Sequence, residues 1–422
     1  MDNRSRILVV KNEISHHFEN EWLPFWEKRG YDQKFGGFLT SYDDEGNEAK
    51  DINKYIVTQA RMIWAYSFLY GLYPERAVYL ESAKQGVEFM LAHFWDNKHE
   101  GWAWSTDREG NVLDNGKIIY GEAFMIYALS QYGLSSGDPL GAVYASKTFD
   151  LLQKYAADTA RGGYYENLEP DWSIAGPGYF AGDRKSLDIH MHLMEAFTTL
   201  YQLTKEEIHK RKLNEVIEVI TQHMIDHANG CGRNQFDITF NPVPPISINR
   251  TWNNDREKAS VTEDNIDITS YGHNIELSWL LNRAASIIGD DPKKFYDLTR
   301  KLGEHTLKYG IDAQYGGVYR DGHHDGPAII RDKEWWQQCE ALVGLLDAYQ
   351  VLGNDTYFSA FENCWNFVNR KMINHDVGEW RQLLTVEGAS IVSNMGNAWK
   401  AMYHTGRSLI ECINRLNQLL EA

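Results

Sequence analysis

A histidine and a glutamate three residues apart, His273 and Glu276, begin a strongly apolar segment at 270–284. Residues three apart share one face of a helix, so this pair could present a base and a carboxylate to the same ligand. The aromatic residues Tyr271 and Trp279 lie beside it. Taken alone, the pair is better explained as a hydrogen-bonded, partly buried histidine with a glutamate at the surface.

Similar polar residues recur at comparable places in five other apolar segments, which changes the interpretation. They are Gln59 and Arg61; Tyr120 and Glu122; Asp188, His190 and His192; Trp335, Trp336, Gln337 and Glu340; and Trp399, His404 and Arg407. If the six segments are helices of one closed ring, these ends point at a common axis. Four residues embedded in apolar helices, Arg61, His192, His273 and His404, are then better explained by one functional site than by four separate structural roles.

The chemistry open to such a site is narrow. The sequence holds no HExxH, no cysteine pair at zinc spacing, no GxGxxG or Walker motif and no GxSxG. His190 and His192 are two apart and would face different ways on a helix. We therefore predict neither a metal nor a cofactor. Acid–base catalysis by neutral histidines remains. Two imidazoles on opposite sides of a sugar could move a proton at the carbon next to a carbonyl, while an arginine stabilises the enediolate oxygen.

The elements that would position these residues repeat along the chain. Hairpins marked by glycines and aromatic residues recur six times, at Gly36, Gly101, Gly162, Gly232, Gly316 and Gly378. Two helical stretches lie between successive hairpins: 51–72 and 74–96, 117–134 and 138–158, 184–204 and 206–229, 265–289 and 291–310, and 332–352 and 355–374. A last helix at 397–420 pairs with a first at 4–28. The pattern predicts one all-α domain over 1–422, an (α/α)6 barrel of twelve helices with short β-hairpins on one face.

One segment departs from the repeat. Residues 229–270 lack helix signals and contain Pro242, Pro244 and Pro245. A loop this long in a compact domain is usually functional or disordered. With Phe236, Phe240, Trp252 and Arg256 it is predicted to be an ordered lid.

Composition limits the partners and the location. The net charge of −17 argues against nucleic acid and acidic membranes. No run of 18 apolar residues and no signal peptide is evident. The four scattered cysteines are typical of reduced thiols, so we expect a cytoplasmic protein. The 14 tryptophans exceed what a core needs and are typical of sugar sites. The oligomeric state is not indicated.

The segments RMIWAY, HMHLMEAF, YGHNIELSWLL, WWQQCEALV and WKAMYHTGR resemble the N-acylglucosamine 2-epimerase superfamily, most closely its cellobiose 2-epimerase branch. The resemblance covers essentially the whole chain. It implies the (α/α)6 barrel and a cofactor-free epimerisation at C2 through ring opening and a cis-enediol. His273 and His404 would be the acid–base pair, and Arg61 and His192 would contact the reacting end of the sugar. The other predicted substrate-binding residues are Tyr120, Asp188, Glu276, Trp336, Glu340 and Trp399.

Two features depart from that branch. Asp188 stands where the branch usually carries asparagine, and the loop at 229–270 is longer. A longer lid would fill the space that the second sugar of a disaccharide needs. We therefore expect interconversion of D-mannose and D-glucose, with cellobiose 2-epimerase and mannose–fructose isomerase as alternatives.

Two other functions remain open on the sequence. A glycoside hydrolase would need two carboxylates about 5–10 Å apart, drawn from Asp188, Glu276 and Glu340. A sugar-binding or protein-interaction module could also use the same barrel, since fold does not imply function.

Overall fold

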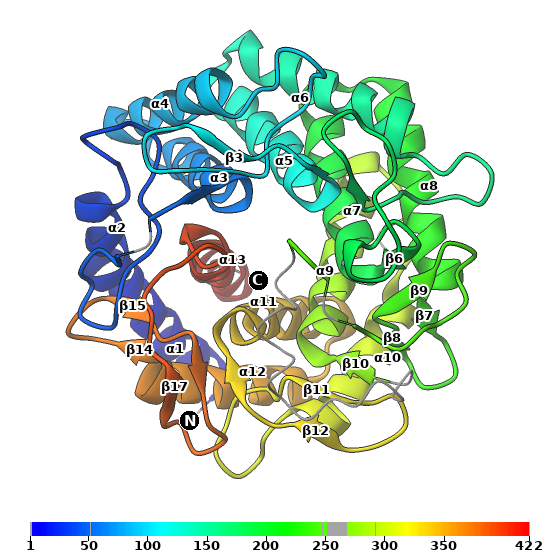
Figure 1. The fold of residues 1–422 in the computed structure, drawn as a ribbon. Helices are drawn as coiled ribbons and strands as arrows, with labels where there is room; N and C mark the ends of the chain where they lie inside the picture. The colour runs from blue at the N-terminus through cyan, green and yellow to red at the C-terminus, as the bar shows by residue number, and fades with distance from the viewer. Residues whose placement is uncertain (1, 51, 247, 251–267, 292, 422) are drawn as a thin grey trace.

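Six helices surround a common axis and form the inner layer of the protein in the computed structural model (Figure 1). The structure describes residues 2–50, 52–246, 248–250, 268–291 and 293–421. The inner helices are α3 (Ile56–Leu72), α5 (Ile119–Ser136), α7 (Leu187–Thr204), α9 (Tyr271–Ile288), α11 (Trp335–Leu352) and α13 (Met402–Glu421). Each packs on the next, and α13 packs on α3, so the ring is closed.

Six outer helices cover this ring. They are α4 (Ala77–His93), α6 (Pro139–Leu151), α8 (Glu207–His223), α10 (Tyr296–His305), α12 (Asp355–Phe367) and the N-terminal helix, which runs through α1 (Asn3–His17), a π-turn and α2 (Leu23–Arg29). Helix α1 packs against α13, which joins the two ends of the chain. The twelve helical segments in the described part of the chain confirm the predicted (α/α)6 barrel.

Burial explains which helices lie inside. In α5, residues 119–133 are all buried, and most residues of the other inner helices are buried as well. The outer helix α8 instead buries one stripe, formed by Leu213, Val216, Ile217 and Ile220. A helix that is apolar on every side belongs inside a protein, whereas an amphipathic helix covers a core with one face.

Short strands occupy one end of the ring. They are β1 (Lys54–Tyr55), β2 (Ser105–Thr106), β3 (Val112–Asp114), β4 (Lys117–Ile118), β5 (Asn167–Leu168), β6 (Arg184–Ser186), β7 (Ile225–Asp226), β8 (Cys231–Gly232), β9 (Gln235–Asp237), β10 (Ile268–Ser270), β11 (Asp321–His323), β12 (Ala328–Ile330), β13 (Lys333–Glu334), β14 (Ile373–Asn374), β15 (Glu379–Trp380), β16 (Leu383–Leu384) and β17 (Ser390–Val392). The strand that precedes an inner helix pairs with one from the next repeat, as β1 does with β2 and β13 with β16.

A buried lysine two residues before an inner helix ties that helix to the preceding hairpin. Each such lysine lies 2.8–3.1 Å from a hairpin aspartate, in the pairs Lys54–Asp32, Lys117–Asp96, Lys185–Asp158 and Lys333–Asp312. In the sixth repeat Lys400 lies 3.0 Å from Glu379 instead. Five of the six repeats therefore have an ion-pair clamp next to the start of the inner helix.

A second clamp uses the fourth residue of the helix. Its side chain accepts a hydrogen bond from a backbone N–H of the hairpin, in the pairs Gln59–Phe38, Glu122–Trp102, His190–Tyr164, Asn274–Gly232 and Gln338–Val318. Gln59, Glu122 and His190 therefore belong to the scaffold.

The long segment at 229–270 is partly described. It contains β8, β9 and β10, and its residues Asn249 and Arg250 reach two other repeats. The Asn249 amide donates to the Tyr179 carbonyl at 2.8 Å, and Arg250 Nε lies 2.6 Å from the Asp114 carboxylate. Trp252 and Arg256, on which the predicted lid also depends, lie outside the described residues.

The four cysteines are free and buried. Among the described residues, no helix is long and apolar enough to cross a bilayer.

The Lys333→Met variant should lose about 3–5 kcal/mol of unfolding free energy, because it leaves the buried Asp312 carboxylate without its ammonium. Urea denaturation measures this loss. Lys84→Met, at an exposed position, is the control and should change little. Equal stability of the two variants would contradict the clamp.

Candidate active site

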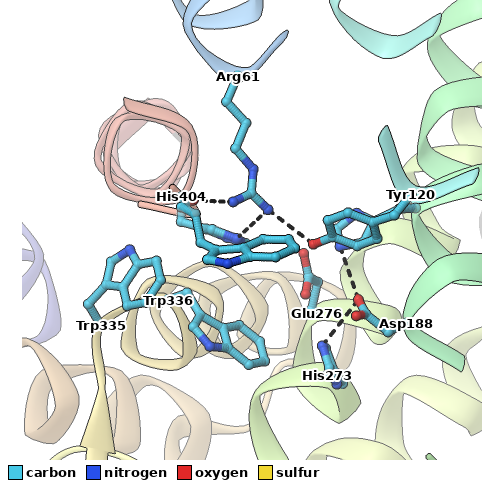
Figure 2. Close-up of a pocket in the computed structure, with 10 residues that line it drawn as sticks. Arg61, Tyr120, Asp188, His273, Glu276, Trp335, Trp336 and His404 are labelled. Carbon is cyan, nitrogen blue, oxygen red and sulfur yellow. Dashed lines mark hydrogen bonds and ion pairs between the residues drawn. The ribbon is translucent and has the colours of Figure 1, made fainter. Parts of the chain in front are cut away.

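A pocket lies where the first turns of the inner helices meet, with about 400 Å³ of empty space that includes its opening to solvent (Figure 2). Its lining residues are Arg61, Tyr120, Asp188, His192, His273, Glu276, Trp335, Trp336, Trp399 and His404.

A constant register brings these side chains together. We count seven residues from the position of the clamp lysine, which is occupied by Thr269 in the fourth repeat. The residues found there in the six inner helices are Arg61, Phe124, His192, Glu276, Glu340 and Arg407. Because all six helices start at the same height, residues at one register converge on the axis. The clamps therefore position the site.

His404 is held in one tautomer. Its Nδ1 lies 2.7 Å from the Glu340 carboxylate, which accepts the N–H, so the Nε2 lone pair points to Arg61, 3.4 Å away. Burial and the nearby charges of Arg61 and Arg407 hold the pKa of His404 well below its usual range. At neutral pH the imidazole is therefore uncharged and can accept a proton.

Arg61 spans the side of the pocket next to His404. Its guanidinium donates to the Trp399 carbonyl and to the Tyr120 hydroxyl, the latter at 3.1 Å. It also lies over the Phe124 ring, 4.5 Å from the ring centre. These contacts fix a cation beside the Nε2 atom of His404.

His273 approaches the pocket from a different side (Figure 2). Its Nε2 lies 3.5 Å from Asp188 Oδ1, and His192 Nε2 lies 3.3 Å from the same oxygen. Burial would raise the pKa of Asp188, but the charges of His273 and His192 hold it well below the usual range. Trp336 packs beside both imidazoles, with ring centres 4.6 Å from His273 and 5.9 Å from His404.

His192 differs from His404 in charge. Burial disfavours its charged form, but Asp188 and Glu195 favour it more strongly and raise the pKa of His192 to about 9. Its Nδ1 lies 3.2 Å from the Glu195 carboxylate. One site thus holds a neutral imidazole at His404 and a charged one at His192.

Arg407 links the helices beneath the pocket. Its guanidinium donates to Glu276 at 2.9 Å, to Glu340 at 2.7 Å and to Glu195. These carboxylates come from α9, α11 and α7, and Arg407 itself from α13. Burial and the neighbouring Glu340 raise the pKa of Glu276 above its usual range.

The Oε2 atom of Glu276 is buried and has no hydrogen-bond partner among the described residues. Because Glu276 lines the pocket, this oxygen can meet a ligand hydroxyl.

Nine of the ten residues predicted from the sequence line this pocket, while their chemical roles stay predictions. Glu340 does not line it and lies behind His404 instead. Trp335 lines the pocket and was outside the predicted set. Glu195 was also missed, although its i, i+3 spacing from His192 could have indicated it.

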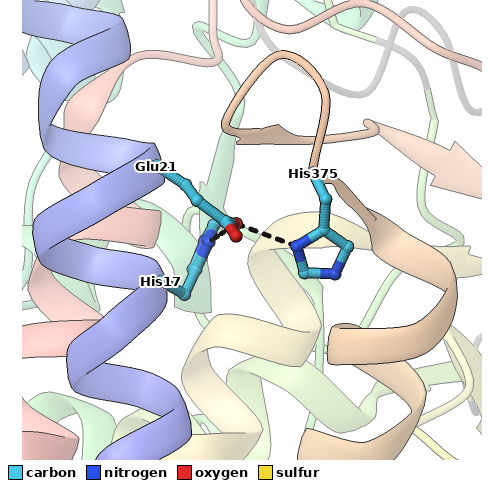
Figure 3. Close-up of side chains that lie close together, drawn as sticks. All are labelled: His17, Glu21 and His375. Atoms are coloured by element: carbon cyan, nitrogen blue, oxygen red, sulfur yellow. Dashed lines mark hydrogen bonds and ion pairs between the residues drawn. The ribbon is translucent and has the colours of Figure 1, made fainter.

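Two groups of side chains have potential metal-ligand atoms within 4.8 Å of one another. In both groups, hydrogen bonds already account for this arrangement. In the pocket, Arg407 already occupies the carboxylates of Glu276 and Glu340. Far from it, His17, Glu21 and His375 form the second cluster (Figure 3). There the Trp380 indole donates to His17 Nε2 at 2.9 Å, so His17 Nδ1 carries a proton and donates to Glu21 at 2.7 Å. A protonated ring nitrogen has no lone pair for a metal.

Comparison with known proteins finds relatives that match over nearly the whole chain. The sequence model of N-acylglucosamine 2-epimerase (GlcNAc 2-epimerase) matches residues 36–408. A cellobiose 2-epimerase from Bacteroides fragilis is 28% identical over 96% of this chain and 99% of its own. The solved structure of cellobiose 2-epimerase from Spirochaeta thermophila is 28% identical, covers 99% of both chains and has a TM-score of 0.86. A D-mannose isomerase structure shares the fold, with a TM-score of 0.79, 20% identity and 97% of both chains covered.

Arg407→Met should lose about 3–5 kcal/mol of unfolding free energy, because three buried carboxylates lose their shared cation. Chemical denaturation provides the measurement. Arg300→Met, at an exposed position, serves as the control. A stability equal to that of the control would show that the carboxylates do not depend on Arg407.

Proposed function

Since the chain belongs to the N-acylglucosamine 2-epimerase family, we propose that it is an isomerase that inverts C2 of an aldose without a cofactor. The observation that carries this proposal is the placement of two imidazoles, His273 and His404, on different sides of one pocket. Epimerisation needs a base on one face of the carbon and an acid on the other.

The first step uses a neutral imidazole. After ring opening, C2 lies next to the C1 aldehyde, so its proton can be removed. His404 is suited to this because Glu340 holds its Nδ1–H and leaves the Nε2 lone pair toward the pocket. The electron pair of the C2–H bond moves toward O1 and gives a cis-enediolate. Arg61, 3.4 Å from Nε2, can donate to that oxygen.

The second step returns a proton to the other face of C2. His273 lies on that side, with its Nε2 next to the ionised Asp188, which stabilises an imidazolium. A proton from His273 to C2 restores the aldehyde with inverted configuration. In the reverse direction the two histidines exchange roles. The free Oε2 of Glu276 and the rings of Trp336 and Trp399 would orient the sugar.

Two substrates are supported by different observations. The cellobiose 2-epimerase names of the relatives support a glucose unit at the reducing end of a β-1,4-disaccharide, and they favour this alternative over our expectation of free D-mannose. Residues 249–250 reach Tyr179 and Asp114 in two other repeats, so part of the long segment packs across repeats as the expected lid would, and this supports a narrower mouth and a free monosaccharide such as D-mannose only if the segment continues over the pocket.

Product analysis with D-mannose and cellobiose side by side separates these two readings. A narrow mouth predicts that D-mannose is converted to D-glucose faster than cellobiose is epimerised. Faster turnover of cellobiose would exclude the free monosaccharide as the main substrate and assign the disaccharide. D-fructose as the main product from D-mannose would assign an isomerase that moves the carbonyl instead.

His404→Ala and His273→Ala should each lower turnover about 10²–10⁴-fold, because each removes one of the two proton-transfer groups. Chromatography of the epimer products measures this, and circular dichroism checks the fold. His190→Gln is the matched control, because glutamine fills the same clamp position at Gln59 and Gln338. It should retain activity. If an alanine variant keeps more than about a tenth of the wild-type rate, the histidine that it replaces is not a catalytic residue.

The pH profile of kcat/KM should have its acid limb below the ordinary histidine pKa of about 6.5, because His404 stays neutral down to lower pH. Activity should also fall near pH 9, where His192, which contacts Asp188 in the pocket wall, loses its proton. Charged His192 also stabilises the folded protein. Its contribution to the free energy of unfolding is fully present below pH 6.5 and is lost as the pH rises through about 9. Asp188→Asn should move the alkaline limb to lower pH, and an unchanged limb would exclude His192 as its origin.

A further inference from the structure

The clamp of the fourth repeat differs from the others. Its hairpin aspartate is Asp226, and the residue two before α9 is Thr269 in place of a lysine. Asp226 keeps the position of the other clamp aspartates, since its carbonyl accepts from the Gly230 amide just as Asp32 accepts from Gly36. The fourth repeat therefore keeps the carboxylate of the clamp and lacks the ammonium.

The other repeats show what such a carboxylate binds. Asp32 contacts the buried Lys54 and also the outer Arg108, at 3.1 and 2.9 Å. Asp158 contacts the buried Lys185 and the outer Arg161, at 3.0 and 3.5 Å. In these two repeats the carboxylate has one inner cation and one outer guanidinium.

Asp226 has the outer guanidinium, because Arg233 lies 3.0 Å from its Oδ2. On the inner side stand His324, whose Nδ1 lies 3.2 Å from Oδ2, and Cys231. All three side chains are buried, and one ligand atom from each lies within 4.8 Å of the others. A carboxylate oxygen, an imidazole nitrogen and a sulfur are the donors that zinc takes in proteins.

We propose that Asp226, Cys231 and His324 bind one zinc-class divalent ion, which replaces the missing lysine ammonium of the fourth repeat. Bonds of about 2.0–2.3 Å to three such donors fit atoms this close, with water as the fourth ligand. Arg233 and Asn229 donate to the same Oδ2 of Asp226, at 3.0 and 3.1 Å, and fix the orientation of the carboxylate as outer partners of metal ligands do.

Charge and protons balance in this binding. Burial raises the pKa of the Cys231 thiol to about 12, so without metal the thiol is protonated. The ion forms the metal–sulfur bond as the S–H bond breaks, and the proton leaves to water. His324 Nδ1 donates to Asp226 Oδ2 when no ion is bound, so binding displaces this proton, frees the Nδ1 lone pair for the ion and leaves the neutral ring protonated on Nε2. Two negative ligands neutralise the ion, and Arg233 leaves one positive charge, the same total as Asp32 with Lys54 and Arg108.

The ion would act in structure, and the epimerisation proposed above does not use it. Cys231 lies in β8, where the long segment at 229–270 begins. His324 follows β11, which pairs with β10 at the end of that segment. One ion would therefore join both ends of the segment beside α9, the helix that carries His273.

Metal titration of the whole chain tests this site without any activity measurement. Chelator-treated protein should take up one Co²⁺ per chain and show a thiolate-to-cobalt charge-transfer band. Zn²⁺ should displace it and raise Tm by roughly 3 °C at about a hundredfold excess over Kd, whereas Mg²⁺ should do neither. Cys231→Ser should lose the band. Cys364→Ser is the matched control, because this thiol is equally buried and its pKa is also raised to about 12, and it should keep the band.

A second variant covers the case in which Cys231→Ser misfolds. Thr269→Lys restores the ammonium of the other repeats, so it should fold and should no longer bind Co²⁺. Three results would overturn the proposal: no charge-transfer band in the wild type, a band that survives in Cys231→Ser, or unchanged Co²⁺ binding in Thr269→Lys. The first would mean that protonated His324 alone takes the place of the lysine.

Discussion

Arg407 places one positive charge among three buried carboxylates, and the pocket depends on that arrangement. Glu195, Glu276 and Glu340 come from different inner helices and all contact Arg407. Glu276 lines the pocket itself, and the other two contact histidines that line it. Glu340 orients His404, and Glu195 keeps His192 charged. Burial and the neighbouring Glu340 raise the pKa of Glu276. The charge of each wall residue therefore follows from how one guanidinium is shared.

The same network joins the two proposed catalytic groups. From His404 it runs through Glu340, Arg407 and Glu195 to His192, and from there through Asp188 to His273. The arginine interrupts any transfer of protons along it. What the network can transmit is electrostatic, because a change of charge on one imidazole alters the field at its neighbours. This fits a reaction in which the two histidines must hold opposite protonation states.

Much of the fold could be predicted because its signals are local and repeated. Glycine turns and apolar helices recur at nearly constant intervals, and a ring of six pairs follows from them. The pocket residues could be predicted for the same reason, since helices that start in register bring Arg61, His192 and His404 to one axis. The clamp lysines, two residues before five of the inner helices, carried the same register in the sequence and were missed.

The contacts behind the pocket could not be predicted in this way. Arg407 and Glu195 are 212 residues apart, and Asp226 and His324 are 98 apart. Such pairs depend on how the ring closes, which no local pattern encodes. The preference between a free sugar and a disaccharide is harder still, because it depends on the long segment that crosses between repeats and on Asp188.

The central claim is that a proton at C2 is removed and replaced by groups of the protein that exchange with water. Incubation in deuterium oxide, followed by NMR of the separated epimers, tests it most directly. The account predicts that the newly formed epimer carries deuterium at C2 from the earliest turnovers and keeps protium at every other carbon. An epimer formed with its original C2 proton, or with deuterium at C1, would contradict it.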